Sequence, residues 1–182
     1  MKKIVEDDKC YGCAACKAVC HQKCITLCMN KLGFWQPEID DKICIDCGIC
    51  QQICISRNYV SQKKAADIYV GVHRDEQIHM QSSSGGAFTA IVSALFNDNA
   101  VIYGAAYDEH MQVVHQKAET IEKIKKFRKS KYVQSKTDGV YDEIRRDLRQ
   151  GKRVIFSGTP CQVSGLYAAL GNSNVEELFT ID

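Results

Sequence analysis

Eight of the eleven cysteines in this 182-residue chain form one spacing pattern that occurs twice. Each copy reads C-x2-C-x2-C-x3-C and follows an Asp-Asp-Lys triplet. The cysteines of the two copies are Cys10, Cys13, Cys16 and Cys20, then Cys44, Cys47, Cys50 and Cys54. This spacing wraps a cubane [4Fe–4S] cluster, which needs four soft thiolate ligands. The pattern therefore predicts two cubane clusters and an electron-carrying role.

The fourth cysteine of each run is expected to ligate the cluster of the other run, because it begins the next helical turn and points away from its own loop. One predicted ligand set is Cys10, Cys13, Cys16 and Cys54. The other is Cys44, Cys47, Cys50 and Cys20. Small residues such as Gly12, Ala14 and Gly48 would let backbone N–H groups approach the sulfurs.

Zinc and disulfides are the alternative interpretations. Zinc sites take their ligands as two pairs rather than as one run of four. Disulfides suit small secreted domains, and the short, charged opening of the chain does not predict a signal peptide. Cys24 and Cys28 follow Cys20 at four-residue intervals. We expect them to be small core residues and not ligands, with an alternative ligand or redox-active thiol pair left open.

Composition changes near residue 60, because ten of the eleven cysteines lie in the first 54 residues. The length fits a small domain at 1–60 and a larger one at 67–182, joined by the polar stretch 61–67. Lys and Arg (24) nearly balance Asp and Glu (22), which does not indicate a nucleic-acid partner. No apolar run approaches the ~20 residues of a membrane helix, so no membrane insertion is predicted. Many free cysteines without an export signal predict a cytoplasmic protein.

Beyond residue 67, short apolar runs alternate with helical patterns, which predicts a mixed α/β domain and an α+β chain overall. The predicted strands span residues 67–73, 100–107, 111–117, 153–157 and 177–182. The predicted helices span 84–98, 120–129 and 160–170, with one more capped by Asp138.

Two loops lead into predicted helix N-termini. One is the Ser-Gly-rich segment 81–87, and the other is 157–162, where Thr159 would cap a helix that begins at Pro160. Unpaired N–H groups at such positions bind anions. Most loops of either kind only turn the chain. Together, behind an electron-carrying segment, they predict a redox cofactor that bears a nucleotide.

Other candidate residues have two interpretations each. Cys161 is either a packed small residue or part of a cofactor pocket. His115 is an isolated histidine on a predicted strand that could face the pocket. Six basic residues within nine positions form either a solvated helix face or a patch for phosphates or an acidic partner. These six are Lys123, Lys125, Lys126, Arg128, Lys129 and Lys131.

Four segments, taken together and in this order, carry a resemblance to a known family. They are Ser83–Thr89, Val101–Tyr107, Ser130–Ser135 and Ser157–Val163. They resemble the N-terminal part of the beta-subunit proteins of the coenzyme F420 hydrogenase/dehydrogenase family. The segment up to about Tyr59 resembles a bacterial two-cluster ferredoxin domain, fused in front as in many members.

This resemblance implies an iron–sulfur flavoprotein oxidoreductase, or a subunit of one, that passes electrons between two [4Fe–4S] clusters and FAD. The flavin contacts that it implies are Ser83, Ser84, Gly85, Gly86, Lys131, Tyr132, Gln134, Thr159, Pro160 and Cys161. It implies no particular catalytic side chain. The alternative is a non-catalytic electron-transfer module that docks on a partner subunit carrying the flavin and substrate site.

The sequence departs from the ferredoxin and beta-subunit patterns in three ways. His21 and Ile55 stand where proline usually follows the fourth cysteine, which should loosen those turns. Lys129 stands where we expect a glycine. The chain stops at Asp182 where relatives continue, so the flavin domain is expected to be incomplete. The chain alone is then expected to bind FAD weakly or not at all, and to associate with a redox partner subunit, another copy of itself or a missing C-terminal half.

Overall fold

The computed structural model describes residues 3–58 and 67–182. The fold is mixed α/β, with a two-stranded sheet in the N-terminal part and a four-stranded mixed sheet in the C-terminal part. All of the predicted linker except Asp67 lies outside the described residues. Within the described ranges, no helix combines the length and the apolar character needed to cross a bilayer.

The N-terminal part holds short elements around a β-hairpin that the sequence patterns did not predict. Its elements are η1 (Asp7–Lys9), α1 (Ala15–Ala18), β1 (Ile25–Met29), β2 (Trp35–Ile39) and α2 (Ile49–Gln52). Strands β1 and β2 pair antiparallel. The side chain of Asn30 closes their turn, because its Oδ1 accepts hydrogen bonds from the N–H groups of Leu32 (2.9 Å) and Phe34 (3.0 Å).

The two cysteine runs fold into the same backbone trace. In the first run, Gly12 and Ala14 have left-handed φ angles of 64° and 65°. At the matching positions of the second run, Asp46 and Gly48 have 57° and 74°. Helices α1 and α2 begin five residues after the first cysteine of their runs. The duplicated spacing therefore produces two loops with the same left-handed positions and the same helix start.

The C-terminal part is built on a sheet of strand order β4-β3-β5-β6. Its strands are β3 (Ala100–Tyr107), β4 (Val113–Ala118), β5 (Arg153–Ser157) and β6 (Leu178–Ile181). Strand β3 pairs antiparallel with β4 and parallel with β5, and β5 pairs parallel with β6. The helices are α3 (Glu76–Met80), α4 (Ala87–Leu95), η2 (Ile121–Phe127), α5 (Val140–Arg149) and α6 (Pro160–Leu170).

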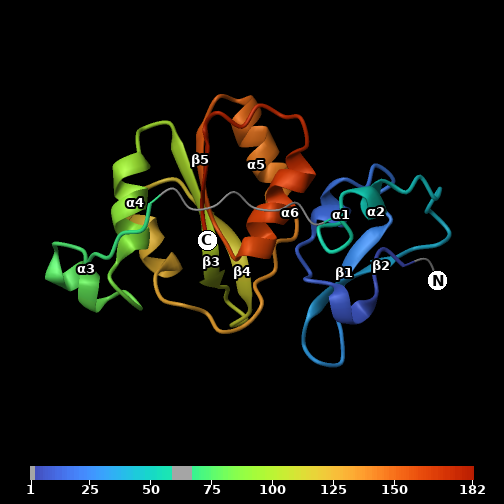
Figure 1. Ribbon diagram of the computed structural model, residues 1–182, viewed down its shortest axis with the longest axis horizontal. Coiled ribbons are helices and arrows are strands. Elements are labelled where there is room, and N and C mark those ends of the chain that lie inside the picture. The colour runs from blue at the N-terminus through green and yellow to red at the C-terminus, as the bar shows by residue number, and fades with distance from the viewer. Residues whose placement is uncertain (1–2, 59–66) are drawn as a thin grey trace.

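Helices cover both faces of this sheet, and Figure 1 shows α4 and α6 on opposite sides of it. Tyr103 and Phe156 point to the face under α5 and α6, where they pack with Ile144 and Leu166. The alternate residues, such as Ile155, point to the other face and pack with residues of α4 and η2. Strands buried on both faces read as continuous apolar runs, which is why β3 and β5 stand out in the sequence.

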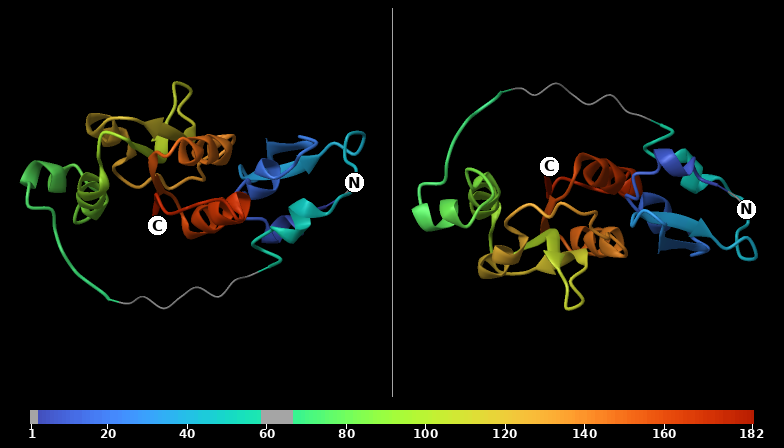
Figure 2. Two further views of the ribbon diagram at one scale, coloured as in Figure 1. Left: turned by 90° about the horizontal axis from the view of Figure 1, so that it is seen from above. Right: turned by 90° about the horizontal axis from the view of Figure 1, so that it is seen from below.

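The N-terminal part packs beside α6 in every view (Figures 1 and 2). Ala15 of α1 is buried in the same apolar cluster as α5 and α6. The segment before α5 adds polar contacts: Thr137 Oγ1 donates to the carbonyl oxygen of Cys13 (3.3 Å), and Lys17 pairs with Asp138 (2.6 Å). The Lys136 ammonium lies 4.4 Å from the centre of the Trp35 ring. The cysteine loops are therefore held against the sheet domain by both apolar and charged contacts.

Three predictions about secondary structure are wrong. Residues 67–73 form no strand, because their apolar side chains, including Ile68 and Val70, lie exposed and meet no strand of the described residues. Helix α4 begins at Ala87 rather than Ser84, since Gly86 at its N-cap is left-handed. Gly139 rather than Asp138 is the N-cap of α5, and the Asp138 carboxylate pairs with Lys17 instead.

Candidate functional site

The cysteines gather around two cavities in the N-terminal part. The first is lined by Cys10, Cys13, Cys16 and Cys54, together with backbone of the first loop. The second is lined by Cys20, Cys44, Cys47 and Cys50, and also by Cys24. Each cavity thus joins three cysteines of one run with the fourth cysteine of the other run. This is the grouping that the crossed ligand sets require.

The two cavities differ in size. The second encloses about 290 Å³ and the first about 20 Å³. A cubane would enter the second with little rearrangement, whereas the first would have to widen around it. Among the described residues, no three His, Cys, Asp or Glu side chains are close enough to hold a single metal ion. A cubane does not need three ligands that converge on one metal ion, because each of its four thiolates binds a different iron.

Burial raises the pKa of two thiols of the first cavity. It raises the pKa of Cys13 to about 11 and that of Cys16 further. Each cavity offers four thiols, and soft thiolate ligands of this kind suit the iron of a cubane. Binding of the metal has to release the protons of these thiols. The Gly12 N–H lies 3.4 Å from the Cys10 sulfur, a contact that stabilises negative charge on a ligand thiolate.

Cys24 and Cys28 differ in position. The Cys24 sulfur is buried and lies 3.4 Å from the Cys20 sulfur, and burial raises its pKa to about 12. Cys28 lies on β1, with its sulfur 3.8 Å from Thr26 Oγ1, and it lines neither cavity. That neither is a ligand stays a prediction, and Cys24 is the one placed to replace a lost ligand.

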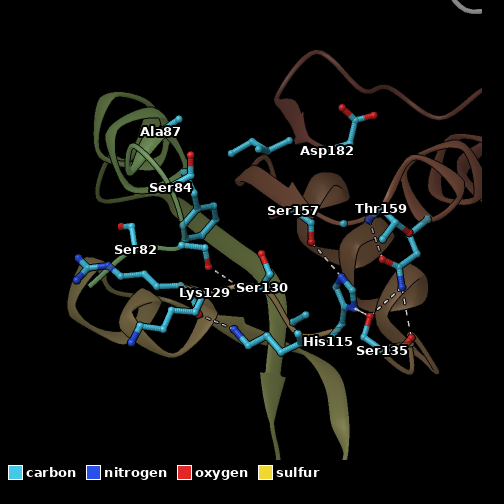
Figure 3. A pocket seen from close by; sticks show the side chains of 18 of the residues that line it. Ser82, Ser84, Ala87, His115, Lys129, Ser130, Ser135, Ser157, Thr159 and Asp182 are labelled. Atoms are coloured by element: carbon cyan, nitrogen blue, oxygen red, sulfur yellow. Dashed lines mark hydrogen bonds between the residues drawn. The ribbon is translucent and has the colours of Figure 1, made fainter. Parts of the chain in front are cut away.

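A third cavity, of about 520 Å³, lies at the ends of β3 and β5. Both predicted helix-start loops line it, at the N-termini of α4 and α6 (Figure 3). Eight of the ten residues that the family resemblance implies as flavin contacts lie in its wall: Ser83, Ser84, Gly85, Gly86, Lys131, Gln134, Thr159 and Cys161. Tyr132 and Pro160 do not line it, and Tyr132 is 95% exposed.

Three of the six basic residues line this cavity beside the N-terminus of α4: Arg128, Lys129 and Lys131. Arg128 donates from Nε to Thr89 Oγ1 (3.1 Å), which ties it to α4. Lys131 Nζ donates to the carbonyl oxygens of Lys126 (2.9 Å) and Arg128 (2.8 Å), and burial lowers the pKa of Lys131. One side of the cavity therefore combines positive charge with the free N–H groups of the α4 N-terminus.

The second wall is a chain of hydrogen bonds centred on His115 of β4 (Figure 3). Its Nε2 lies 3.0 Å from the carbonyl oxygen of Ser157, so it carries the proton and donates. Its Nδ1 then accepts from Ser135 Oγ (3.0 Å). Gln162 Nε2 donates to Ser135 Oγ (2.8 Å), and Gln162 Oε1 accepts from the Thr159 N–H (2.9 Å). Burial lowers the pKa of His115 to about 4, so the ring is neutral near pH 7.

His115 was the one histidine that the sequence placed near a pocket, and it does line the cavity. Its partners Ser135 and Gln162 were not singled out, although both belong to the motif segments. Periodicity could not reveal them, because their side chains meet only when β4, β5 and α6 come together.

Tyr11 connects the cavity with the cysteine loops. It lies between Cys10 and Cys13 in the sequence, and it lines the cavity of the helix-start loops. Gln134 holds the first cysteine loop in this position. Its Nε2 donates to the Tyr11 carbonyl oxygen (3.1 Å), and its Oε1 accepts from the Trp35 N–H (2.6 Å). The first cysteine loop therefore forms part of the cavity wall.

Lys129 has a φ angle of 65°, the left-handed conformation that favours glycine. This conformation agrees with the glycine that the family resemblance leads us to expect at this position. Replacing Lys129 with glycine is expected to raise the free energy of unfolding by about 0.5–1 kcal/mol, measured by denaturant titration. The matched control is Lys125→Gly, within η2 and also exposed, which should lower stability instead. A loss of stability in both variants would show that Lys129 is not strained.

Comparison with known proteins gives two relatives, and no protein-family model matches the chain. The chain is 23% identical over 184 residues to a protein of Methanosarcina mazei named as a subunit of F(420)H(2) dehydrogenase, which suggests a related family at low identity. This alignment covers 96% of the chain and 52% of that protein, so the chain spans about half of the relative's length. An uncharacterized protein in the rpl9-rpl11 intergenic region of Porphyra purpurea is 33% identical over 69 residues, which are 35% of this chain and 88% of that protein. Over that stretch the chain belongs to one family with the Porphyra protein, whose name assigns no function.

Proposed function

We propose that the chain is an iron–sulfur flavoprotein oxidoreductase, or part of one, that passes electrons between two [4Fe–4S] clusters and FAD. The observation that carries this proposal is the common wall: Tyr11 of the first cysteine loop and both helix-start loops line one cavity. Similarity to a protein named as a subunit of F(420)H(2) dehydrogenase supports a redox role and a partner subunit.

The proposed cluster ligands are the two sets that line the cysteine cavities. They are Cys10, Cys13, Cys16 and Cys54 for the first, and Cys20, Cys44, Cys47 and Cys50 for the second. The first set is the nearer one to the third cavity. A Cβ atom on Gly165 of α6 would lie 3.0 Å from the Cys13 sulfur, so that sulfur packs directly against the helix whose N-terminus lines the cavity.

The proposed flavin site uses the same cavity in two ways. The N-terminus of α4 and the adjacent Arg128 and Lys131 would hold the pyrophosphate. The wall of His115 and Ser135 is neutral, with every polar group already paired, so it would hold an uncharged ring system. When bound, FAD supplies the exchange between two-electron chemistry and the single electrons that a cubane accepts.

A second candidate function is an electron-transfer module whose flavin site is completed by a partner subunit. The outer edge of β6 favours it, because β6 is an edge strand and has no outer neighbour among the described residues. Unpaired edges are where another chain can add a strand.

The flavin proposal predicts the effect of a negative charge at the start of α4. Ala87 is the first residue of this helix, is exposed and lines the cavity. Ala87→Asp is expected to weaken FAD binding about ten-fold or more, since the carboxylate repels a phosphate bound at the same N–H groups. The fold should be kept or slightly stabilised, because an acidic residue suits a helix N-terminus. FAD is titrated from the micromolar to the millimolar range and followed by flavin fluorescence.

The matched control is Ala90→Asp, which adds the same charge to the same helix at an exposed position outside the cavity. It should leave FAD affinity unchanged. Equal affinity in both variants and the parent would refute the α4 site, and no FAD binding by the parent would favour the module that needs a partner subunit.

A further inference from the structure

A groove lies where the N-terminal part meets helices α5 and α6. Figure 1 shows α1 beside α6 in this region. It encloses about 1050 Å³ and shares no lining residue with the cavity of the helix-start loops. One wall comes from α1 and the loop that follows it, and the other comes from α5 and the end of α6.

The charge in this groove is mostly positive. Its basic side chains are Lys17, Lys23, Arg145, Arg146 and Arg149, and its two carboxylates are Asp138 and Asp142. Both carboxylates are paired, Asp138 with Lys17 (2.6 Å) and Asp142 with Arg145 (2.5 Å).

Three basic side chains of the groove remain unpaired: Lys23, Arg146 and Arg149. They are exposed and form no ion pair within the part of the chain that the structure describes. They stand on both walls, so a partner between the walls meets positive charge from two sides.

The floor between these charges is apolar. Val19, Ile25, Ile49 and Ile53 line the groove. Cys20 also lines it, and the same cysteine lines the second cysteine cavity. An apolar centre with a charged rim is the anatomy of a protein–protein interface rather than of a small-anion site, where donors converge on one point.

We infer that this groove docks a small acidic electron-carrier protein. Charge complementarity selects an acidic partner, the apolar floor selects a protein, and Cys20 puts the second cluster ligand set beside the docking surface. The inference rests on the proposed function only in the choice of an electron carrier as the partner. The docking itself is tested by binding, without a measurement of redox activity.

The test is binding of an acidic flavodoxin, a carrier without iron, measured by calorimetry against the iron-loaded chain. Arg146→Glu combined with Arg149→Glu is expected to weaken binding about ten-fold or more at low salt. Binding by the parent should weaken as salt rises, because these charges are exposed. Arg146→Gln with Arg149→Gln, which removes the charges without reversing them at the end of α5, should give a smaller loss in the same direction.

The matched control is Lys123→Glu combined with Lys125→Glu, an equal charge change at exposed positions outside the groove. It should bind flavodoxin as the parent does. Equal weakening by this control would overturn the inference, as would self-association of the chain that the groove variants abolish, since a second copy would then fill the groove. Iron content and FAD affinity are measured on every variant. A chain that lacks iron but still binds flavodoxin through the groove would refute the proposed function and leave this inference standing.

Discussion

Replacing Cys20 with serine is expected to remove about four of about eight irons per chain, and to remove them from the cavity of Cys44, Cys47 and Cys50. The expectation follows from the grouping of the thiols, in which Cys20 lines the second cavity although it belongs to the first run. Replacing Cys54, which belongs to the second run but lines the first cavity, is expected to remove the irons of the first cavity instead. Iron analysis after anaerobic reconstitution gives the loss, and electron paramagnetic resonance of the reduced protein reports the cluster that remains.

Pairs of variants distinguish the crossed arrangement from an uncrossed one by iron content alone. If the ligands are crossed, Cys20→Ser with Cys47→Ser damages one cluster twice and costs about four irons, whereas Cys20→Ser with Cys13→Ser costs about eight. If each run binds its own cluster, these two losses are exchanged. These iron losses require that each serine abolishes one cluster. A substitute ligand would keep the cluster in place and hide the loss.

Cys24 is the residue that could act as that substitute, because its sulfur lies 3.4 Å from the Cys20 sulfur. The series is therefore made in a Cys24→Ser background. That background is expected to keep about eight irons, and Cys28→Ser serves as its control since Cys28 lines neither cavity. A loss of about four irons from Cys24→Ser alone would identify Cys24 as a ligand and overturn the assignment.

The sheet of the C-terminal part was predictable because burial on both faces leaves continuous apolar runs. The predicted bounds of β5 and α6, 153–157 and 160–170, are those of the structure. The strand predicted at 67–73 is wrong because an apolar run needs a neighbouring strand as well as a propensity, and no strand within 3–58 or 67–182 lies beside it. The hairpin β1–β2 was missed, since its five-residue strands contain cysteine, proline and glutamine.

The candidate site also has features that the sequence could predict and features that it could not. Residue types and spacing predict both helix-start loops, and they line one cavity. The contacts that join the two parts could not be predicted, because Gln134 meets Trp35 and Tyr11 across 99 and 123 positions of sequence. The packing of the N-terminal part against the C-terminal part also decides which cysteine loop faces the cavity. Both loops have the same backbone, so only their surroundings distinguish the first from the second.

Those surroundings predict losses of stability of different size for the same glycine-to-alanine substitution made in the two loops. Gly12 has a φ angle of 64°, and a Cβ atom there would overlap the Trp35 carbonyl oxygen and Gln134 Nε2. Gly12→Ala is therefore expected to lower the free energy of unfolding by about 3 kcal/mol or more, since left-handed strain adds to a backbone clash at the junction of the two parts. Trp35 is the single tryptophan of the chain, and its fluorescence should change as its contact with Lys136 is lost.

Gly48→Ala is the matched control. Gly48 has a φ angle of 74°, and nothing lies within 4 Å of a Cβ atom built on it. The equivalent position of the first loop already holds an alanine, Ala14, at a φ angle of 65°. Gly48→Ala should therefore cost about 1 kcal/mol and leave the Trp35 emission unchanged. Denaturant unfolding followed by fluorescence measures both variants. Equal losses would mean that the two loops differ in nothing but sequence, and that the first loop is not clamped against the sheet domain by Gln134.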